Sequence, residues 1–153
     1  MPRRYHQICP VARTLDLIGE RWTFLILREL FLGARTFTDI REGCPGISTR
    51  ILSDRLKLLA DQHLVRREVY AQHPLRADYR LTPAGESLAP VLQSLFRWGM
   101  EHTLDARQRA VVARHVRGRI ERGQANPAAR ALIEEYGEHA TGRRAVKTRQ
   151  RPG

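Results

Sequence analysis

Residues 47–61 constrain the fold most, because they combine helical periodicity with a sharp turn on their N-terminal side. Three leucines fall on one face of the predicted helix: Leu52, Leu56 and Leu59. The opposite face is mainly polar, and residues 43–46, Gly-Cys-Pro-Gly, cannot continue a helix. A shorter helix is predicted before this turn, with Thr36 as its N-cap and Asp39 at the capping-box position. The order is therefore helix, turn and amphipathic helix.

The periodicity changes from helical to alternating after this helix. Residues 65–71 and 78–81 are predicted strands, and residues 72–77 join them. This connection is longer than a two-residue turn and contains a proline, so it predicts a projecting loop, of which a wing is one kind. Two further helices are predicted near the N-terminus, at residues 9–19 and 21–32. The fold class is mainly α (α+β), with a two-stranded sheet.

A broad apolar face marks the helix predicted to begin at Thr82-Pro83, where threonine is the N-cap and proline the first helical residue. We predict one helix from there through the following apolar residues: Leu88, Val91, Leu92, Leu95, Trp98 and Met100. A helix at the edge of a small domain needs less apolar surface for its own core. We therefore expect a partner helix to cover this face.

Basic residues dominate the charge of the chain. There are 27 Lys and Arg against 16 Asp and Glu, which gives a formal net charge of +11 and a pI near 11.0. Such a charge favours a polyanionic partner, although it does not separate DNA from RNA or from an anionic membrane surface. Residues 104–153 hold 12 Lys and Arg and 5 Asp and Glu, whereas residues 1–103 hold 15 and 11. Most of the excess charge therefore lies in the C-terminal third.

The shift in composition divides the chain near residue 104. Residues 1–104 are predicted to form the main folded domain, and residues 105–153 a basic C-terminal extension. Within the extension, helices are predicted at residues 106–122 and 128–138. Residues 142–153 have the composition of a disordered segment.

The polar face of the amphipathic helix lies where a helix-turn-helix protein reads base edges in the major groove. Arg50 suits guanine, because its guanidinium can donate two hydrogen bonds to O6 and N7. Lys57, one or two turns further on, is better placed for a phosphate. The predicted DNA-binding residues, with one before the turn and two in the loop, are Thr36, Ser48, Thr49, Arg50, Ser53, Asp54, Lys57, His73 and Arg76.

Residues 9–103 resemble the HxlR family of winged helix-turn-helix regulators, relatives of the MarR-type repressors. Matching stretches include Cys9-Pro10-Val11, Gly19-Glu20-Arg21-Trp22, Phe37-Thr38-Asp39-Ile40, Leu52-Ser53-Asp54-Arg55-Leu56 and Leu81-Thr82-Pro83-Ala84-Gly85. The resemblance implies that residues 1–104 are a DNA-binding and dimerisation domain. It implies a repressor or activator that binds a palindromic operator in double-stranded DNA as a homodimer. It also implies that the loop after Tyr70 is the wing and that the first and last helices join the protomers. On those flanking dimerisation helices the predicted interface residues are Val11, Leu15, Leu88, Leu92, Leu95 and Trp98.

Cys9 is the candidate redox sensor of the chain. Some members of the family use a cysteine at this position to sense oxidants or electrophiles, and the positive end of a helix beginning at Cys9-Pro10 favours the thiolate. The alternative is that Cys9 packs at the dimer interface. Cys44, in the turn, is predicted to be a small buried residue.

The protein is expected to be cytoplasmic and nucleoid-associated, with both cysteines reduced. No apolar run approaches the roughly 20 residues that span a bilayer, and residues 1–6 lack the apolar stretch of a signal peptide. A structural disulfide is not expected in that compartment.

Catalytic and metal sites are not expected in this chain. It has no Gly-rich phosphate loop and no recognisable nucleophile–base motif, so we predict a non-enzyme without a cofactor. His6, Cys9 and His73 are too few and too scattered for a zinc site. Two alternatives stay open: a general RNA-binding protein acting through the basic extension, and a thiol redox enzyme using Cys9.

Overall fold

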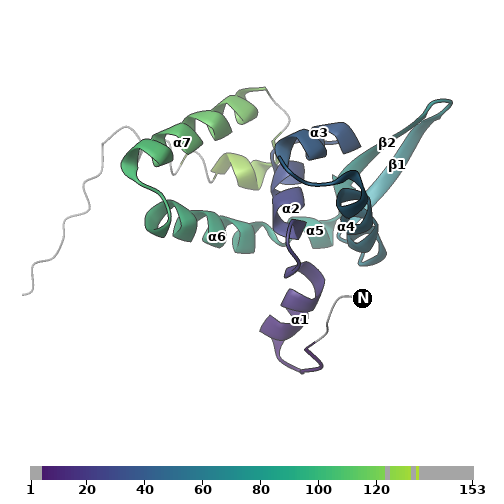
Figure 1. Cartoon of the computed structure of the whole chain (residues 1–153), viewed down its shortest axis with the longest axis horizontal. Coiled ribbons are helices and arrows are strands. Elements are labelled where there is room, and N and C mark those ends of the chain that lie inside the picture. The colour runs from purple at the N-terminus through teal and green to yellow at the C-terminus, as the bar shows by residue number, and fades with distance from the viewer. Residues whose placement is uncertain (1–4, 123–124, 132–133, 135–153) are drawn as a thin grey trace, which may run out of the picture.

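The chain folds as a winged helix-turn-helix, as predicted, with a two-stranded hairpin that projects from one end of a group of helices (Figure 1). The computed structural model describes residues 5–122, 125–131 and 134. In chain order the elements are α1 (Pro10–Ile18), α2 (Thr23–Phe31), α3 (Phe37–Gly43), α4 (Thr49–Asp61), β1 (Val65–Gln72), β2 (Leu75–Leu81), α5 (Pro83–Glu86), α6 (Ala89–His102) and α7 (Ala106–Glu121). Among the described residues, no helix has the length and apolar character needed to cross a membrane.

The main hydrophobic core lies between α2, α3, α4 and the base of the sheet. The three leucines predicted to face inward on α4 are buried: Leu52, Leu56 and Leu59 are 0%, 2% and 1% exposed. They belong to the same buried cluster as Ile26 of α2 and Ile40 of α3. Burying each leucine contributes about 2 kcal/mol. This burial orients α4 with its polar face outward.

Backbone geometry determines where α2 and α4 begin. α2 begins at Thr23, two residues later than predicted, because Trp22 has a left-handed φ of 80° that an α-helix cannot continue. The turn between α3 and α4 contains Gly46 at a φ of 90°, a region that favours glycine. Ser48 then caps α4, because its Oγ accepts a hydrogen bond from the Ile51 amide at 3.2 Å.

The prediction of a loop at residues 72–77 is wrong, because the strands pair almost to the tip of the hairpin. β1 and β2 are antiparallel, and their pairing extends to Gln72 opposite Leu75. Two residues, His73-Pro74, connect the strands. The outer parts of both strands are exposed. They therefore lack the apolar alternation by which a half-buried strand is recognised in a sequence.

The single helix predicted between residues 83 and 100 is also wrong, since α5 and α6 are separate. Thr82 caps α5 as predicted, and its Oγ1 accepts a hydrogen bond from the Gly85 amide at 3.1 Å. Pro90, in the first turn of α6, has no N–H to donate to the carbonyl of Glu86. Its ring also clashes with that carbonyl in a continuous helix. The chain therefore bends between the two helices.

The basic extension packs back onto the rest of the protein. α7 follows the prediction for residues 106–122 closely, and residues 127–131 and 134 are helical within or next to the predicted segment 128–138. The segment predicted to be disordered, residues 142–153, lies outside the described residues. The division of the chain at residue 104 stays a prediction.

Two hydrogen bonds and a second apolar cluster hold the extension in place. The backbone N–H of Asn126 donates to the carbonyl of Phe31 at 2.8 Å, and the side-chain Nε2 of Gln93 donates to the carbonyl of Ala128 at 2.9 Å. The cluster joins residues of α2, α6, α7 and the segment after it: Phe31, Leu32, Ala89, Leu92, Val116, Ile120, Ala125, Ala128 and Ala129. α7 and the segment after it are therefore part of the folded protein.

Glu29 of α2 is a buried carboxylate, 2% exposed, that lies between two arginines. Arg28 Nη2 lies 2.8 Å from Glu29 Oε1, and Arg119 Nη1 of α7 lies 2.8 Å from Glu29 Oε2. Arg28 Nη2 also donates to the carbonyl of Gly43, the last residue of α3, at 2.7 Å. This cluster ties α7 to the helix-turn-helix.

Candidate nucleic-acid interface

The polar face of α4 is exposed along its whole length. The six side chains predicted on this face are all exposed: Ser48, Thr49, Arg50, Ser53, Asp54 and Lys57. Their distribution follows from the buried leucines on the opposite face. α4 therefore presents a continuous row of donors and acceptors to solvent, with two cations and one carboxylate.

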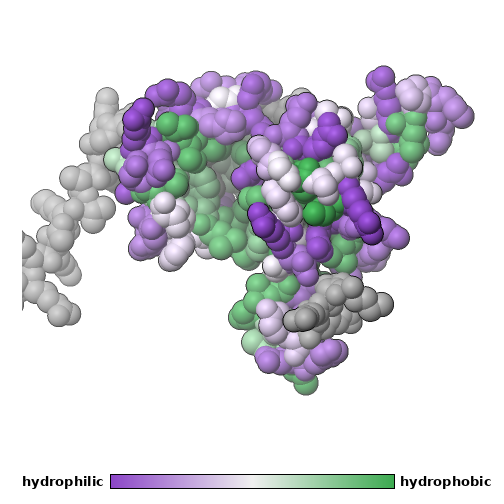
Figure 2. Space-filling model, in the orientation of Figure 1, coloured by the Kyte–Doolittle hydropathy of each residue, from purple (hydrophilic) through white to green (hydrophobic). Residues whose placement is uncertain are grey.

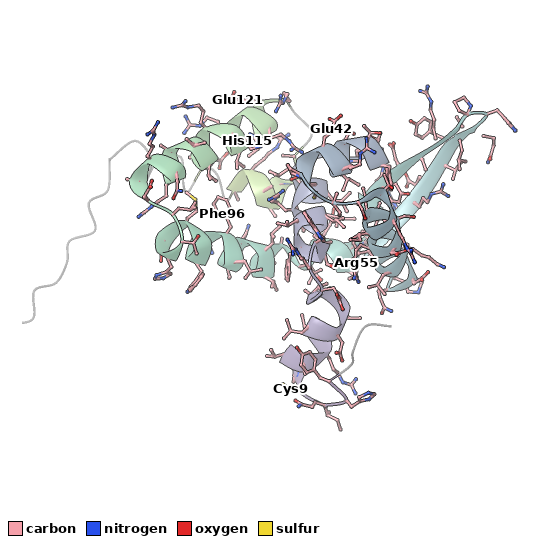
Figure 3. The ribbon with its side chains drawn as sticks, in the orientation of Figure 1. Cys9, Glu42, Arg55, Phe96, His115 and Glu121 are labelled. Atoms are coloured by element: carbon pink, nitrogen blue, oxygen red, sulfur yellow. The ribbon has the colours of Figure 1, made fainter. Side chains whose placement is uncertain are left out.

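Arg55 lies on α4 but is not part of this exposed face (Figure 3). Its Nη2 lies 3.1 Å from Glu20 Oε2, in the segment between α1 and α2. This ion pair holds α4 against the N-terminal part of the protein and takes Arg55 out of the set of candidate DNA contacts.

The N-terminus of α4 favours an anion. The first turn of the helix contains no acidic residue, so nothing offsets the partial positive charge at the start of the helix dipole. Ser48 has a structural role at this position as the N-cap. Its hydroxyl fixes where the helix begins and therefore where Thr49 and Arg50 lie.

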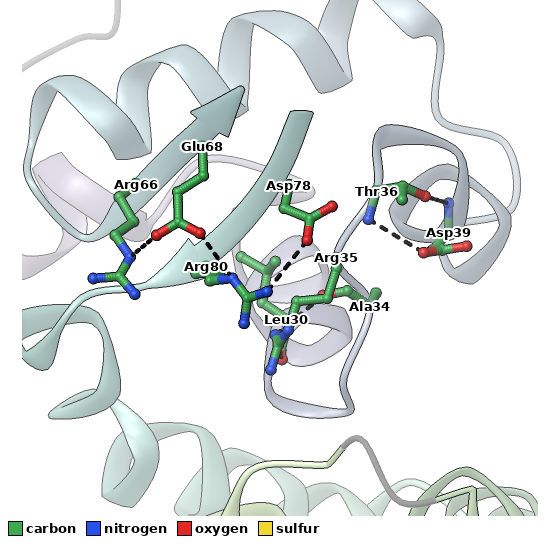
Figure 4. A network of polar contacts seen from close by, with 9 residues as sticks. All are labelled: Leu30, Ala34, Arg35, Thr36, Asp39, Arg66, Glu68, Asp78 and Arg80. Atoms are coloured by element: carbon green, nitrogen blue, oxygen red, sulfur yellow. Dashed lines mark hydrogen bonds and ion pairs between the residues drawn. The ribbon is translucent and has the colours of Figure 1, made fainter. Parts of the chain in front are cut away.

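Thr36 is engaged in the capping box predicted from the sequence (Figure 4). The Asp39 amide donates to Thr36 Oγ1 at 3.1 Å, and the Thr36 amide donates to Asp39 Oδ2 at 3.2 Å. Burial raises the pKa of Asp39, but the hydrogen bonds from Thr36 and Arg35 and the charge of Arg119 outweigh it, so this pKa is lowered overall. Asp39 thus stays ionised and holds the first turn of α3.

The base of the wing is fixed to the helix-turn-helix by backbone hydrogen bonding. Thr36 forms an isolated β-bridge with Asp78 of β2, and the Tyr79 amide donates to the carbonyl of Arg35 at 2.7 Å. Arg35 Nη1 donates to the carbonyls of Leu30 and Ala34 at 3.1 and 3.2 Å (Figure 4). The wing therefore has a defined direction relative to α3 and α4.

Charged groups at the wing base pair with one another, both within each strand and between the two strands. Glu68 contacts Arg66 at 2.7 Å and Arg80 at 3.0 Å, and Arg80 Nη2 lies 3.3 Å from Asp78 Oδ2 (Figure 4). Burial lowers the pKa of Arg35, as does the charge of Arg80, while Asp78 and Glu86 act in the opposite direction. Two arginines and two carboxylates offset each other on this face of the wing.

The wing carries further basic side chains that these carboxylates do not contact. His73 lies in the connection at the tip and Arg76 on β2, and both are exposed as the prediction requires. Arg67 was missed by the sequence reasoning: it is exposed on β1 and has no ion pair in the described part of the chain. It alternates with Arg66 and Glu68 and so lies on the opposite face of the strand. Strand alternation is the signal that separates Arg67 from the paired arginines.

The predicted interface residues do not form one surface. Val11 and Leu15 of α1 are 66% and 41% exposed, and Leu95 and Trp98 of α6 are 49% and 61% exposed. Together with other residues, Val11, Leu15 and Leu95 line an apolar groove between α1 and α6, to which Val91 also belongs.

Leu88 and Leu92, in contrast, are only half-exposed in the protomer. Leu88 packs against the main core and Leu92 against the second apolar cluster. The broad apolar face of α6 is therefore divided. The chain's own α7 covers one side, and the other side remains uncovered (Figure 2).

The two cysteines lie in different environments. Cys9 is exposed and is the N-cap of α1, at the end of the molecule where α1 projects (Figure 3). Cys44 is 1% exposed, as predicted for a small buried residue. Burial raises the pKa of the Cys44 thiol; the charge of Glu29 acts in the same direction and that of Arg28 in the opposite one. Within the described residues, no group of three or more His, Cys, Asp or Glu side chains is placed to hold a metal ion.

Comparison with known proteins gives consistent matches to the region before α7. The sequence model of the HxlR-like helix-turn-helix family matches residues 17–107. The HTH-type transcriptional regulator YvaP of Bacillus subtilis (strain 168) is 36% identical over 96 residues, which are 62% of this chain and 89% of YvaP. The HTH-type transcriptional regulator Rv3095 of Mycobacterium tuberculosis (strain ATCC 25618 / H37Rv) is 45% identical over 92 residues, or 60% of this chain and 58% of that protein.

Solved structures agree with these sequence matches. The reduced form of the redox regulator HypR superposes with a TM-score of 0.58 at 35% identity, covering 61% of this chain and 92% of that chain. Diamide-treated YodB from B. subtilis superposes with a TM-score of 0.51 at 34% identity, covering 65% of this chain and all of that chain. The family match ends in the first turn of α7, so most of the extension lies outside it.

Proposed function

The chain belongs to the HxlR-like helix-turn-helix family and is a transcriptional regulator of the HTH type, and from this premise we propose that it binds double-stranded DNA as a homodimer through α4. The observation that carries the proposal is the exposed row of six polar side chains on α4, which begins at the capped N-terminus of the helix. In a helix-turn-helix, this part of the second helix enters the major groove.

Within this row, the three charged side chains have roles that their chemistry suits. Arg50 is assigned to a guanine, whose O6 and N7 accept two hydrogen bonds. Asp54 is assigned to a cytosine, whose N4 amino group is a donor. Lys57 lies further along the helix and is assigned to a backbone phosphate, together with Arg76 and His73 of the wing.

The experiment compares operators selected from a random duplex library by the full-length protein and its variants. Arg50→Ala should relax the preference at one position of each half-site by about 1–3 kcal/mol. Lys57→Ala should weaken all duplexes alike and reduce the slope of log affinity against log salt by about one. Arg107→Ala, an exposed arginine of α7, is the matched control and should leave the selected operator unchanged. If Arg50→Ala selects the native operator with native affinity, the assigned reading face is wrong.

The homodimer is proposed to form through the uncovered apolar groove between α1 and α6. Val11, Leu15 and Leu95 expose apolar surface in this groove, and Trp98 exposes more on α6. A second copy of the same surface is the simplest cover. Half-sites of a palindromic operator would then lie about 34–36 Å apart. Val11→Glu should shift the sedimentation profile from dimer to monomer. Val111→Glu, on an exposed position of α7, should not.

A general RNA-binding function is the second candidate, because α7 exposes several arginines. Deleting the extension does not separate the two candidates, since this also uncovers Phe31 and Glu29. Replacing three exposed arginines by glutamine at Arg107, Arg114 and Arg117 leaves those contacts intact. If this triple variant loses duplex and RNA affinity to the same extent, while Arg50→Ala changes neither, the extension is the nucleic-acid site.

Cys9 is proposed as a thiol that makes DNA binding respond to oxidants. Two observations support this: the thiol is exposed at the start of α1, and the structural relatives include redox regulators in reduced and oxidised forms. The test is operator affinity before and after treatment with diamide, for the native chain and for Cys9→Ser. A response in the native chain alone supports the proposal, and identical responses exclude it.

A further inference from the structure

An apolar cavity lies between α2, α6, α7 and the segment after α7, with a volume of about 250 Å³. Six of its lining residues represent all four segments: Phe24, Phe31, Leu92, Phe96, Val116 and Ala128. Figure 2 shows hydrophobic side chains gathered between α6 and α7, and Phe96 is labelled on α6 in Figure 3. The residues that line the cavity include neither Cys9 nor any side chain of the polar face of α4. Leu95 is shared with the groove proposed for the dimer.

The polar side chains at the cavity are engaged by the protein itself. Gln93 Nε2 donates to the carbonyl of Ala128 at 2.9 Å. Arg28 donates through Nε to Glu29 Oε1 at 2.9 Å and through Nη2 to the carbonyl of Gly43 at 2.7 Å. A charged or strongly polar ligand would have to break these contacts or lose its own hydration without replacement. The lining therefore favours a neutral, mainly apolar molecule.

The extension completes the cavity and so distinguishes this chain from the family pattern. Val116 and Ala128 lie beyond residue 107, where the family match ends. The backbone N–H of Asn126 donates a hydrogen bond of 2.8 Å to the carbonyl of Phe31. This bond holds the segment after α7 against the cavity. Without this segment, the apolar side chains of α2 and α6 would form an open surface.

We propose that this cavity is a binding site for a neutral, mainly apolar small molecule, such as an aromatic compound. A cavity of about 150 Å³ lined by apolar side chains binds benzene, so the present volume suits a ligand of about ten non-hydrogen atoms. Leu25, which is 38% exposed, lies at the boundary with solvent and provides an apolar entry. Such a ligand would be buried against phenylalanine and leucine side chains of α2 and α6 and against valine and alanine side chains of the extension.

The test uses 1-naphthol as a neutral probe and 1-naphthoate as its charged analogue, added to the full-length protein without DNA. Methyl NMR spectra should show saturable shifts at Leu92 and Val116, with a dissociation constant for 1-naphthol of about 1 mM or below. Because no DNA is present, the result does not depend on the proposed function.

Two variants fill the cavity from different segments, so that the failure of one to fold does not decide the test. Ala128→Leu and Val116→Phe should each weaken 1-naphthol binding about tenfold or more. Ala131→Leu adds the same side chain as Ala128→Leu at an exposed position three residues away. It should bind the probe like the native protein.

The proposal is overturned if the native protein shows no saturable binding of 1-naphthol, or if both folded cavity variants bind it as tightly as Ala131→Leu does. Tighter binding of 1-naphthoate than of 1-naphthol would overturn the assignment of a neutral ligand, because it would mean that Arg28 exchanges Glu29 for the ligand carboxylate. Loss of binding in the cavity variants alone supports the site.

Discussion

Replacing Arg119 by alanine should destabilise the protein by about 2–3 kcal/mol, because it leaves one oxygen of a buried carboxylate without a partner. Glu29 is 2% exposed, and its Oε2 lies 2.8 Å from Arg119 Nη1. Loss of a buried pair typically costs about 3–5 kcal/mol. Here Arg28 continues to pair with Glu29 Oε1 at 2.8 Å, and Arg119 itself retains a side-chain exposure of 20%, so we expect a smaller effect.

The measurement is urea and thermal unfolding of the full-length chain. The expected loss corresponds to a decrease in Tm of about 4–12 °C for a domain of this size. Arg114→Ala removes an exposed arginine from the same helix and should change stability by less than about 0.5 kcal/mol. A double-mutant cycle with Glu29→Gln isolates the pairwise energy. If Arg119→Ala costs no more than Arg114→Ala, α7 does not dock on α2 as described.

Three further substitutions test local features of the helix-turn-helix. Gly43→Ala should cost about 1–3 kcal/mol, measured by urea unfolding, because its Cβ would overlap the carboxylate of Glu29, which two arginines hold in place. Ser48→Ala should cost about 1 kcal/mol through loss of the α4 N-cap, whereas Ser53→Ala, at an exposed position in the helix interior, should cost nothing; equal effects would exclude the capping role. The pKa of Asp39 is lowered from its ordinary value of 3.8 in the folded state, so its contribution to stability is present above that pH and is lost as pH falls through the folded pKa. The stability difference between the native protein and Asp39→Asn should therefore be constant near neutrality and disappear in acid, and a difference that grows below pH 4 would contradict this.

Local signals predicted the helix-turn-helix well, because short-range contacts determine its elements. The spacing of leucines in α4 specified its buried face, and the capping box of Thr36 and Asp39 specified the start of α3. The N-cap predicted at Thr82 was equally local. The exposed candidate residues of α4 then followed from the buried ones, since a helix with one face in the core must present the other to solvent.

The errors arose where local signals are weak or in conflict. The outer wing is exposed on both faces, so its strands lack alternation and were predicted as a loop. Pro90 was the available signal for the break before α6, but the apolar residues on either side of it fit one continuous helical face. In each case, the backbone followed hydrogen-bonding constraints that hydrophobic spacing does not encode.

The amino-acid sequence by itself determined the order of the elements, the inward face of α4 and the residues that α4 presents to solvent. Only the tertiary structure showed that the basic extension packs against α2 and α6. Glu29 and Arg119 are 90 positions apart, and their pairing depends on how α7 folds back on α2. The same packing divides the apolar face of α6 between a covered side and a free groove, and it encloses the cavity. These contacts join α7 to α2 and α6, segments that are far apart in the sequence. The residue spacing within each helix does not specify which other helix it packs against, so these contacts are defined only in the folded chain.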